Sequence, residues 1–293
     1  MSARTMSLAV GALAALAACN SEPISPPDDT ALAPSFITSA TGATVVTDAD
    51  VSRQAEETPP LKSWVLYIRP DATGTFRVGP GSPPEGVGSL EFFTPGLSKI
   101  TLFNFDYDQT PIADFTALAY HTYQSSASVA IQLPSINLTV DFNGPSVEGG
   151  FTTLVFEPVY NLVGQGAVLP NVWQDWDGIF AGNAIWWSTR SFGTVCAVAC
   201  YVTWNQILEQ APNATILLAL GLNQGSGSPA LTASTDAFVV GVNGHSTTYD
   251  FEPFVTASNK GDCKDGGWQN ARRSDGSPFK NQGDCVSYTN RGR

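Results

Sequence analysis

The stretch AFVVGVNGHSTTYDF, residues 237–251, carries the strongest local fold signal in the chain. Apolar residues up to Val242 lead into Asn243-Gly244, and a second run of β-type residues, 247–251, follows. Asn-Gly is typical of two-residue turns between antiparallel strands, because both residues accept positive φ angles. The segment therefore predicts a hairpin whose turn fixes the register of its two strands.

Runs rich in β-branched and aromatic residues recur through residues 61–258 and predict about ten short strands. Besides the hairpin, these runs are Trp64–Ile68, Gly88–Phe93, Lys99–Asp106, Leu118–Tyr123, Val129–Leu133, Asn137–Phe142, Phe151–Phe156, Ile185–Trp187 and Ile216–Leu222. So many strands in about 200 residues predict an all-β fold, a two-sheet antiparallel β-sandwich, for which the resemblance described below implies a jelly roll. One short helix is expected from Thr203 to Gln210, because Thr203 is a capping residue and Pro212 follows.

The first residues indicate export. Arg4 precedes an apolar run, Leu8 to Ala18, that is too short to span a bilayer. The run ends in Leu16-Ala17-Ala18-Cys19, which resembles the lipobox of bacterial lipoproteins. That resemblance implies a signal peptide over residues 1–18, acyl chains such as palmitate on Cys19, and anchoring to the cell envelope, at the outer membrane or the cell surface. The alternative is an ordinary signal peptide, cleaved near Ala18 to give a secreted protein.

Composition divides the remainder into three parts. Residues 19–60 are rich in Pro, Ser, Thr, Ala and Asp and predict a flexible lipidated stalk, although residues 36–46 also suit a peripheral strand. Residues 61–258 form the predicted sandwich, and residues 259–293 form a basic tail, stapled by a disulfide and too small for a core of its own. Residues 20–258 carry six basic and twenty-two acidic side chains, whereas residues 259–293 carry seven and four. The acidic body excludes nucleic acid as a partner.

Four cysteines remain once Cys19 is set aside, in a chain expected to leave the reducing cytoplasm. Three pairings are open, and we favour Cys196 with Cys200 and Cys263 with Cys285, because each pair is local in the sequence. A metal site is the competing interpretation, but no histidine stands near either pair.

Several segments together resemble a family of uncharacterised secreted bacterial β-sandwich proteins, similar in outline to jelly-roll carbohydrate-binding modules. They are Phe76–Gly81, Gly88–Leu90, Gly150–Pro158, the Trp173/Trp176 pair, Gly221–Gly227 and Thr248–Pro253. The resemblance implies the fold and suggests a glycan ligand, although a fold does not fix a function. The tail from Cys263 to Tyr288, with its Gly-Gly-Trp, resembles a short C-terminal element of many secreted bacterial proteins, which implies no established role.

Enzymatic chemistry has little support in this chain, which has two histidines, His121 and His245, and no Gly-x-Ser-x-Gly or His-Glu-x-x-His motif. Pairs of carboxylates two residues apart share a face if their segment is extended. Asp106 with Asp108 is the pair we assign to a Ca²⁺ ion, and solvated acidic loops are the alternative. Two carboxylates close together could also hydrolyse a glycosidic bond. A glycoside hydrolase or polysaccharide lyase that uses a carboxylate pair is the second function hypothesis.

A cluster of tryptophans and polar side chains gives the first function hypothesis, because aromatic faces beside polar groups suit sugars. The candidate ligand-binding residues are Trp173, Asp175, Trp176, Asp177, Asn183 and Trp186. Core packing is the alternative, and adjacent Trp186 and Trp187 must point to opposite faces of a strand. The sequence thus predicts a membrane-tethered lipoprotein that binds a glycan; a structural or adhesive envelope protein that makes contact through its tail is the third hypothesis. Oligomeric state is left open.

Overall fold

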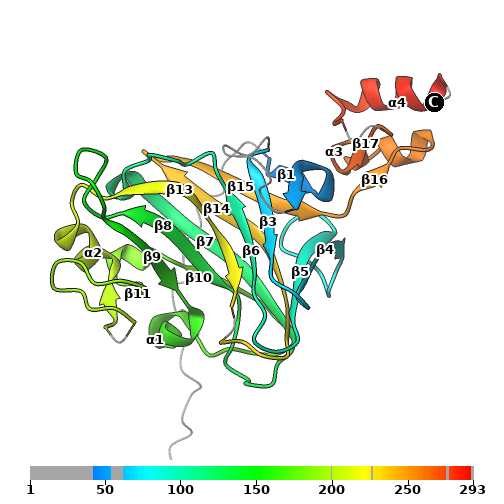
Figure 1. Cartoon of the computed structure of the whole chain (residues 1–293). Helices are drawn as coiled ribbons and strands as arrows, with labels where there is room; N and C mark the ends of the chain where they lie inside the picture. The colour runs from blue at the N-terminus through cyan, green and yellow to red at the C-terminus, as the bar shows by residue number, and fades with distance from the viewer. Residues whose placement is uncertain (1–41, 54–61, 199, 226, 275–276, 292–293) are drawn as a thin grey trace, which may run out of the picture. The chain divides into compact units, whose positions relative to one another are not determined.

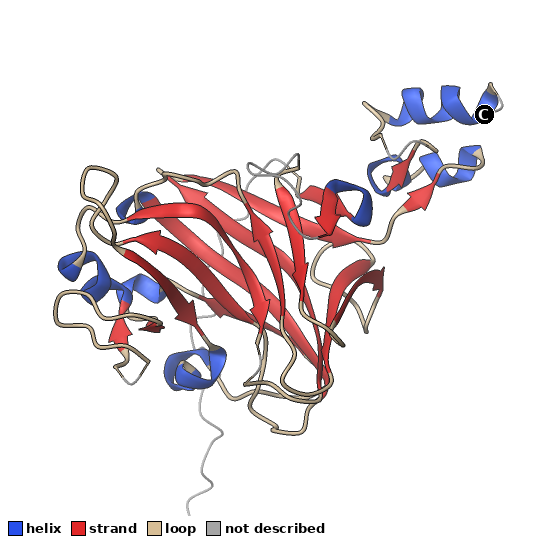
Figure 2. Cartoon of the chain, in the orientation of Figure 1, coloured by secondary structure: helices blue, strands red, loops and turns tan. Residues whose placement is uncertain are grey.

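The computed structural model describes residues 42–53, 62–198, 200–225, 227–274 and 277–291 (Figure 1). The predicted signal peptide and Cys19 lie outside the described residues, so their assignment stays a prediction. Strands dominate the described part of the chain, with short helices in the connections (Figure 2).

Two large sheets make up the body. One has seven strands: β1 (Thr44–Thr47), β4 (Thr73–Val78), β5 (Gly88–Thr94), β7 (Phe115–Ser126), β10 (Trp173–Asp177), β14 (Leu231–Val242) and β15 (His245–Glu252). The other has eight: β2 (Val51–Arg53), β3 (Trp64–Ile68), β6 (Ile100–Asn104), β8 (Ser135–Asp141), β9 (Phe151–Phe156), β11 (Ile185–Ser188), β12 (Val202–Thr203) and β13 (Thr215–Gln224). The chain passes repeatedly from one sheet to the other, as in a jelly roll, and the predicted all-β sandwich is confirmed.

The sheets are antiparallel except at two edges. β1 pairs in parallel with β15, and β2 pairs in parallel with β3. Both edge strands lie in the predicted stalk, so that prediction is wrong for residues 44–53, and the suggested peripheral strand near residue 46 is the correct part. Val46 and Val51 are 2% and 4% exposed, so burial of these side chains holds the segment on the sandwich.

The predicted hairpin is confirmed as β14–β15, with positive φ at Asn243 (52°) and Gly244 (79°). The bounds of β3 and β9 coincide with the predicted runs. The run Val129–Leu133 is not a strand but part of a loop, and β4, β10 and the first half of β14 were not expected. Their polar residues obscured the alternation on which strand prediction depends.

Aromatic side chains join the two sheets across the core. Tyr120 of β7 and Phe156 of β9 pack edge to face at 6.3 Å between ring centroids, and Trp64 of β3 packs on Phe251 of β15 at 5.8 Å. Because each pair has one member in each sheet, the inner faces of the sheets meet directly. Such pairs add to the free energy gained by burying their area.

The predicted helix is confirmed as α2 (Trp204–Gln210), which begins with a capping box formed by Thr203 and Gln206. Its first residue packs on the core, with the Trp204 and Trp186 ring centroids 5.4 Å apart. The expectation of a single helix is wrong, because α1 (Leu162–Gln165), α3 (Gly267–Asn270) and α4 (Gln282–Asn290) are also present. The 3₁₀ turns are η1 (Asp48–Asp50), η2 (Ile112–Asp114), η3 (Pro158–Tyr160), η4 (Phe180–Gly182) and η5 (Lys260–Cys263).

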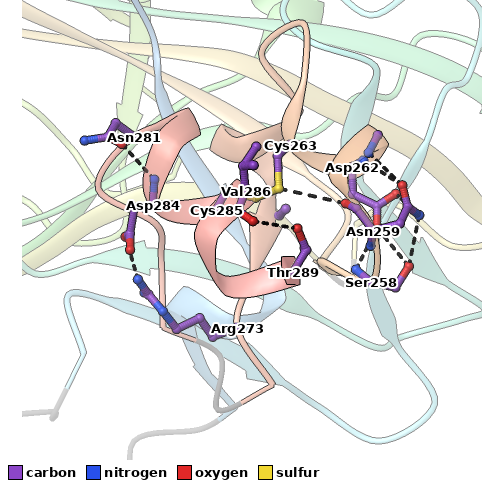
Figure 3. The surroundings of a disulfide bond; sticks show 12 residues. Ser258, Asn259, Asp262, Cys263, Arg273, Asn281, Asp284, Cys285, Val286 and Thr289 are labelled. Carbon is purple, nitrogen blue, oxygen red and sulfur yellow. Dashed lines mark hydrogen bonds and ion pairs between the residues drawn. A yellow bond between two sulfur atoms is a disulfide. The ribbon is translucent and has the colours of Figure 1, made fainter. Parts of the chain in front are cut away.

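The C-terminal tail folds around a disulfide (Figure 3). Strand β16 (Val255–Thr256) pairs in parallel with β17 (Ala271–Arg272), and Cys263 bonds to Cys285 of α4. The expectation that the tail lacks a core is wrong, because a small apolar cluster surrounds the bridge: Ala257, Cys263, Ala271, Phe279 and Cys285. The second predicted disulfide, Cys196 with Cys200, is also present.

Candidate ligand-binding groove

A groove of about 570 Å³ lies on the outer face of the eight-stranded sheet. Ile136, Leu138 and Val140 of β8 are buried in the core, so alternate residues of that strand face outward. The groove is lined by Arg69, Lys99, Val129, Ile131, Gln132, Leu133, Ser135, Asn137, Thr153, Val155, Glu157, Val159, Tyr160, Trp187, Thr189, Asn223, Gly225, Gly227 and Ser228.

Strand register places the floor of the groove in a row across the sheet. Trp187 of β11 lies opposite Val155 of β9, which lies opposite Asn137 of β8. Strand pairing continues beyond the groove lining, through Gly221 of β13 to Phe103 of β6. A Cβ at Gly221 would lie 1.9 Å from a backbone carbonyl oxygen of β6, so the row requires a glycine here. The part of the row that lines the groove is bounded by the Trp187 indole at one end.

A hydrogen-bonded chain of polar side chains runs beside this row. The Thr101 hydroxyl donates to Asn223 Oδ1 at 2.9 Å, and Asn223 Nδ2 donates to the Ser135 hydroxyl at 3.1 Å. Ser135 in turn donates to Asn137 Oδ1 at 3.0 Å. All four residues are at most 8% exposed. This arrangement fixes the rotamers before any ligand binds.

The wall beside the indole is acidic and aromatic. Glu157 directly follows β9, and its Oε2 accepts a hydrogen bond of 2.7 Å from Trp187 Nε1. Burial raises the pKa of Glu157, and the bond from Trp187 partly offsets that rise. Tyr160 and Tyr201 pack against each other with ring centroids 4.4 Å apart. The indole is therefore held in one orientation by a group that also lines the groove.

The loop of residues 127–134 forms one rim. Val129 and Ile131 are 44% and 46% exposed on this rim. Gln124 Nε2 donates to two backbone carbonyls of the loop, at 2.9 and 2.7 Å, and Gln132 Nε2 donates to the carbonyl of Gly227. Gln132 Oε1 is buried with no partner among the residues described.

Two of the sequence-predicted ligand residues are in the core. Trp176 and Trp186 are fully buried, and their indole nitrogens donate to Thr122 and to the carbonyl of Gly178, both at 2.8 Å. Their prediction as ligand contacts is wrong, because large aromatic side chains fill the space between the sheets. The expectation that Trp186 and Trp187 point to opposite faces is confirmed.

The other predicted residues lie away from the groove. Trp173 and Asp175 are on the outer face of the seven-stranded sheet, where Trp173 Nε1 donates to the carbonyl of Pro80 at 2.9 Å. Asp177 Oδ1 accepts backbone N–H groups of the turn that follows, each at 2.8 Å. Asn183 is exposed beyond that turn. The predicted set is therefore divided among the core, a turn and the opposite sheet.

The predicted Ca²⁺ pair has a different geometry from the one expected. Asp106 and Asp108 lie in a turn after β6, not in an extended segment, and Asp108 Oδ1 accepts the Leu218 N–H at 2.6 Å. The extended arrangement on which the prediction depends is thus wrong. Within the described ranges, no group of three or more His, Cys, Asp or Glu side chains is arranged to hold a metal ion.

A second polar cluster lies on the outer face of the seven-stranded sheet. Asp236 and Glu252 are fully buried, and Asp250 is 6% exposed. Burial raises the pKa of Asp236 to about 7 and that of Asp250 to about 8, and the neighbouring carboxylates add to both rises. Backbone N–H groups of residues 85–88 donate to Asp236 and Glu252. Both oxygens of Asp236 and Glu252 Oε1 thus accept from the protein's own backbone, whereas Asp250 Oδ1 and Glu252 Oε2 are buried with no partner among the described residues.

Comparisons with known proteins give no assignment. The chain matches no protein-family model, and no curated protein or solved structure shows significant similarity to it. The resemblances found in the sequence therefore depend on short motifs alone. In the described part of the chain, no helix has the length and apolar character needed to cross a membrane.

Proposed function

We propose that this protein is exported, anchored by lipid at Cys19, and binds a glycan in the groove of the eight-stranded sheet. The observation that supports binding is the juxtaposition of the Trp187 indole with a fixed row of polar side chains. Sugars present apolar C–H faces and hydroxyl groups, which match an indole and amide or hydroxyl side chains, respectively.

The dimensions of the groove favour an extended ligand. Lining residues run from Trp187 of β11 to Asn223 of β13, which are three strand intervals apart, and strands lie about 4.8 Å apart, so the floor spans about 14 Å. The polar side chains beside that row hold one another in fixed rotamers through hydrogen bonds, so little side-chain entropy is lost on binding. An oligosaccharide segment fits these features better than a single sugar.

The lining favours binding over hydrolysis. Most glycoside hydrolases use two carboxyl groups about 5 to 10 Å apart. Glu157 is the one carboxylate among the described residues that line this groove. An enzyme remains the second candidate, and release of reducing ends or unsaturated products from a bound polysaccharide would favour it.

A glycan array followed by calorimetry tests the binding proposal, with the full-length protein purified in detergent. We expect Asn137→Ala to weaken binding about tenfold, because one or two hydrogen bonds to the ligand are lost, and to lower the melting temperature modestly, because the buried Ser135 hydroxyl loses an acceptor. Asn183→Ala is the matched control, because that exposed asparagine lies outside the groove. Absence of binding across the array, or a larger loss with Asn183→Ala, would overturn the proposal.

Fractionation tests the anchor. In a bacterium that processes lipoproteins, the wild-type chain should sediment with membranes and carry acyl chains on the amino-terminal cysteine. Cys19→Ser should move it to the soluble fraction, since a chain without acyl groups lacks lasting attachment. Mass spectrometry that finds an unmodified mature amino terminus on the wild type would refute the anchor and leave the groove proposal intact.

A further inference from the structure

The basic side chains of the acidic body are few, and most have partners. The six within residues 20–258 are Arg53, Lys62, Arg69, Arg77, Lys99 and Arg190. Arg53 and Arg77 form ion pairs with carboxylates at 2.6 and 3.0 Å. Lys62 donates to two backbone carbonyls, and Arg190 lies 4.8 Å from the centroid of a phenylalanine ring. Arg69 and Lys99 form no ion pair with any described carboxylate.

These two cations lie together at one end of the groove. Arg69 directly follows β3 and Lys99 directly precedes β6, and the Arg69 N–H donates to the Lys99 carbonyl at 2.8 Å. Both line the groove. Burial lowers the pKa of Lys99, and the neighbouring Arg69 lowers it further. Two like charges held side by side without a counter-ion make a site where an anion is stabilised.

The opposite end of the groove has the opposite charge. Glu157 follows β9, which is three strand intervals from β6, or about 14 Å away. An acidic group near Glu157 is repelled, whereas one near Arg69 and Lys99 is attracted. The remaining surface of the body, with its excess of acidic residues, offers no general attraction to polyanions.

We infer that Arg69 and Lys99 bind an acidic group of the ligand, so that the groove selects an anionic glycan bearing carboxylate or sulfate. This inference rests on the proposed glycan binding and adds the class of sugar. The guanidinium offers two parallel N–H donors to a planar carboxylate or to a sulfate, and the ammonium adds a point charge.

Pairs of matched polysaccharides test the preference for an anionic glycan, with the full-length protein in detergent. The probes are polygalacturonate against its methyl ester, and dextran sulfate against dextran, so that each pair differs in charge on one backbone. We expect an acidic member to bind at least about tenfold more tightly than its neutral partner, as for charge-assisted hydrogen bonds. Which pair shows the preference identifies carboxylate or sulfate as the acidic group.

The variants Arg69→Gln and Lys99→Gln, singly and together, should remove that preference and leave binding of the neutral partner unchanged. Arg77→Gln is the matched control, because Arg77 lies on the other sheet and forms its own ion pair. Equal binding of charged and neutral forms, or an equal loss with Arg77→Gln, would overturn the inference while leaving glycan binding intact. Absence of binding throughout the glycan array would overturn the proposed function as well.

Discussion

The two outer faces of the sandwich each carry a cluster of polar side chains, and the two clusters differ in what lies over them. On the eight-stranded sheet, Asn137 and its neighbours line an open groove and bond to one another. On the seven-stranded sheet, Asp236 and Glu252 are covered by residues 79–88, whose backbone N–H groups donate to them. Polar character alone therefore does not mark a binding site; what matters here is whether a loop of the protein covers the polar side chains or an open cavity lies over them.

Glycine is essential to the covering loop. Gly86 has φ of +52°, and a Cβ there would lie 1.8 Å from Glu252 Oε1. A residue without a side chain lets the loop backbone approach the carboxylates closely. The groove is instead an open cavity, lined by the polar side chains of Ser135, Asn137 and Asn223, which bond to one another. Substitutions on the seven-stranded sheet should therefore change stability, whereas substitutions in the groove should change ligand binding.

The largest expected effect is on stability, through pH. The pKa values of Asp236 and Asp250 rise from 3.8 to about 7 and about 8 in the folded state. The folded protein therefore holds protons that the unfolded chain releases, and the stability that this provides is present below about pH 4 and lost as pH rises through 7 to 8. Urea unfolding should give a free energy lower by several kcal/mol at about pH 9 than at about pH 4, because each unit of pKa shift corresponds to about 1.4 kcal/mol.

Asp250→Asn sharpens this test, because the neutral amide cannot ionise in the crowded cluster. We expect a flatter pH dependence and a higher free energy of unfolding above about pH 8 than in the wild type. Glycan binding should not change. A free energy of unfolding that rises with pH over this window in the wild-type protein would contradict the assignment.

A somewhat smaller loss is expected from Glu252→Ala. The N–H groups of Val87 and Gly88, 2.5 and 2.9 Å from Glu252 Oε1, would lose their acceptor. Each buried donor left without a partner costs about 1 to 3 kcal/mol, and relief of repulsion with Asp250 offsets part of that cost. Denaturation should show a net loss of about 2 kcal/mol, with faster hydrogen exchange at Val87 and Gly88. Unchanged exchange at these two amides would contradict the covering role.

The sequence predicted the fold better than the site. Strands such as β9 and the β14–β15 hairpin have local signals in residue type and turn chemistry, so their position follows from short segments. The groove depends on strands distant in sequence, because Thr101, Ser135 and Asn223 meet only through pairing. A local signal did exist in β8, where Ser135 and Asn137 alternate with core residues. The clustering of tryptophans in the sequence led to a wrong prediction of ligand contacts, since Trp176 and Trp186 face inward.

Trp187 and Trp173 lie on different outer faces of the sandwich, so their alanine variants should have different effects. Trp187→Ala should weaken glycan binding about tenfold or more, because the indole is the apolar platform of the groove. Trp173→Ala should leave binding unchanged and loosen residues 79–88, since Trp173 Nε1 bonds to Pro80. Calorimetry on both variants, with hydrogen exchange, separates the two roles. Greater loss of binding with Trp173→Ala would place the site on the seven-stranded sheet.

The smallest expected effect is that of Glu157→Gln. Because burial raises the pKa of Glu157, its charged form is disfavoured in the folded protein, and a neutral isostere removes that penalty while its amide oxygen still accepts from Trp187 Nε1. We expect the free energy of unfolding near neutral pH to rise by less than about 1 kcal/mol, with the indole kept in place. Binding of an acidic polysaccharide should then strengthen slightly, since one repelling charge is gone from the groove. A loss of binding as large as that of Trp187→Ala would instead mean that the Glu157 carboxylate itself contacts the ligand. The groove would then differ from the cluster of Asp236, Asp250 and Glu252, because its carboxylate would take part in binding.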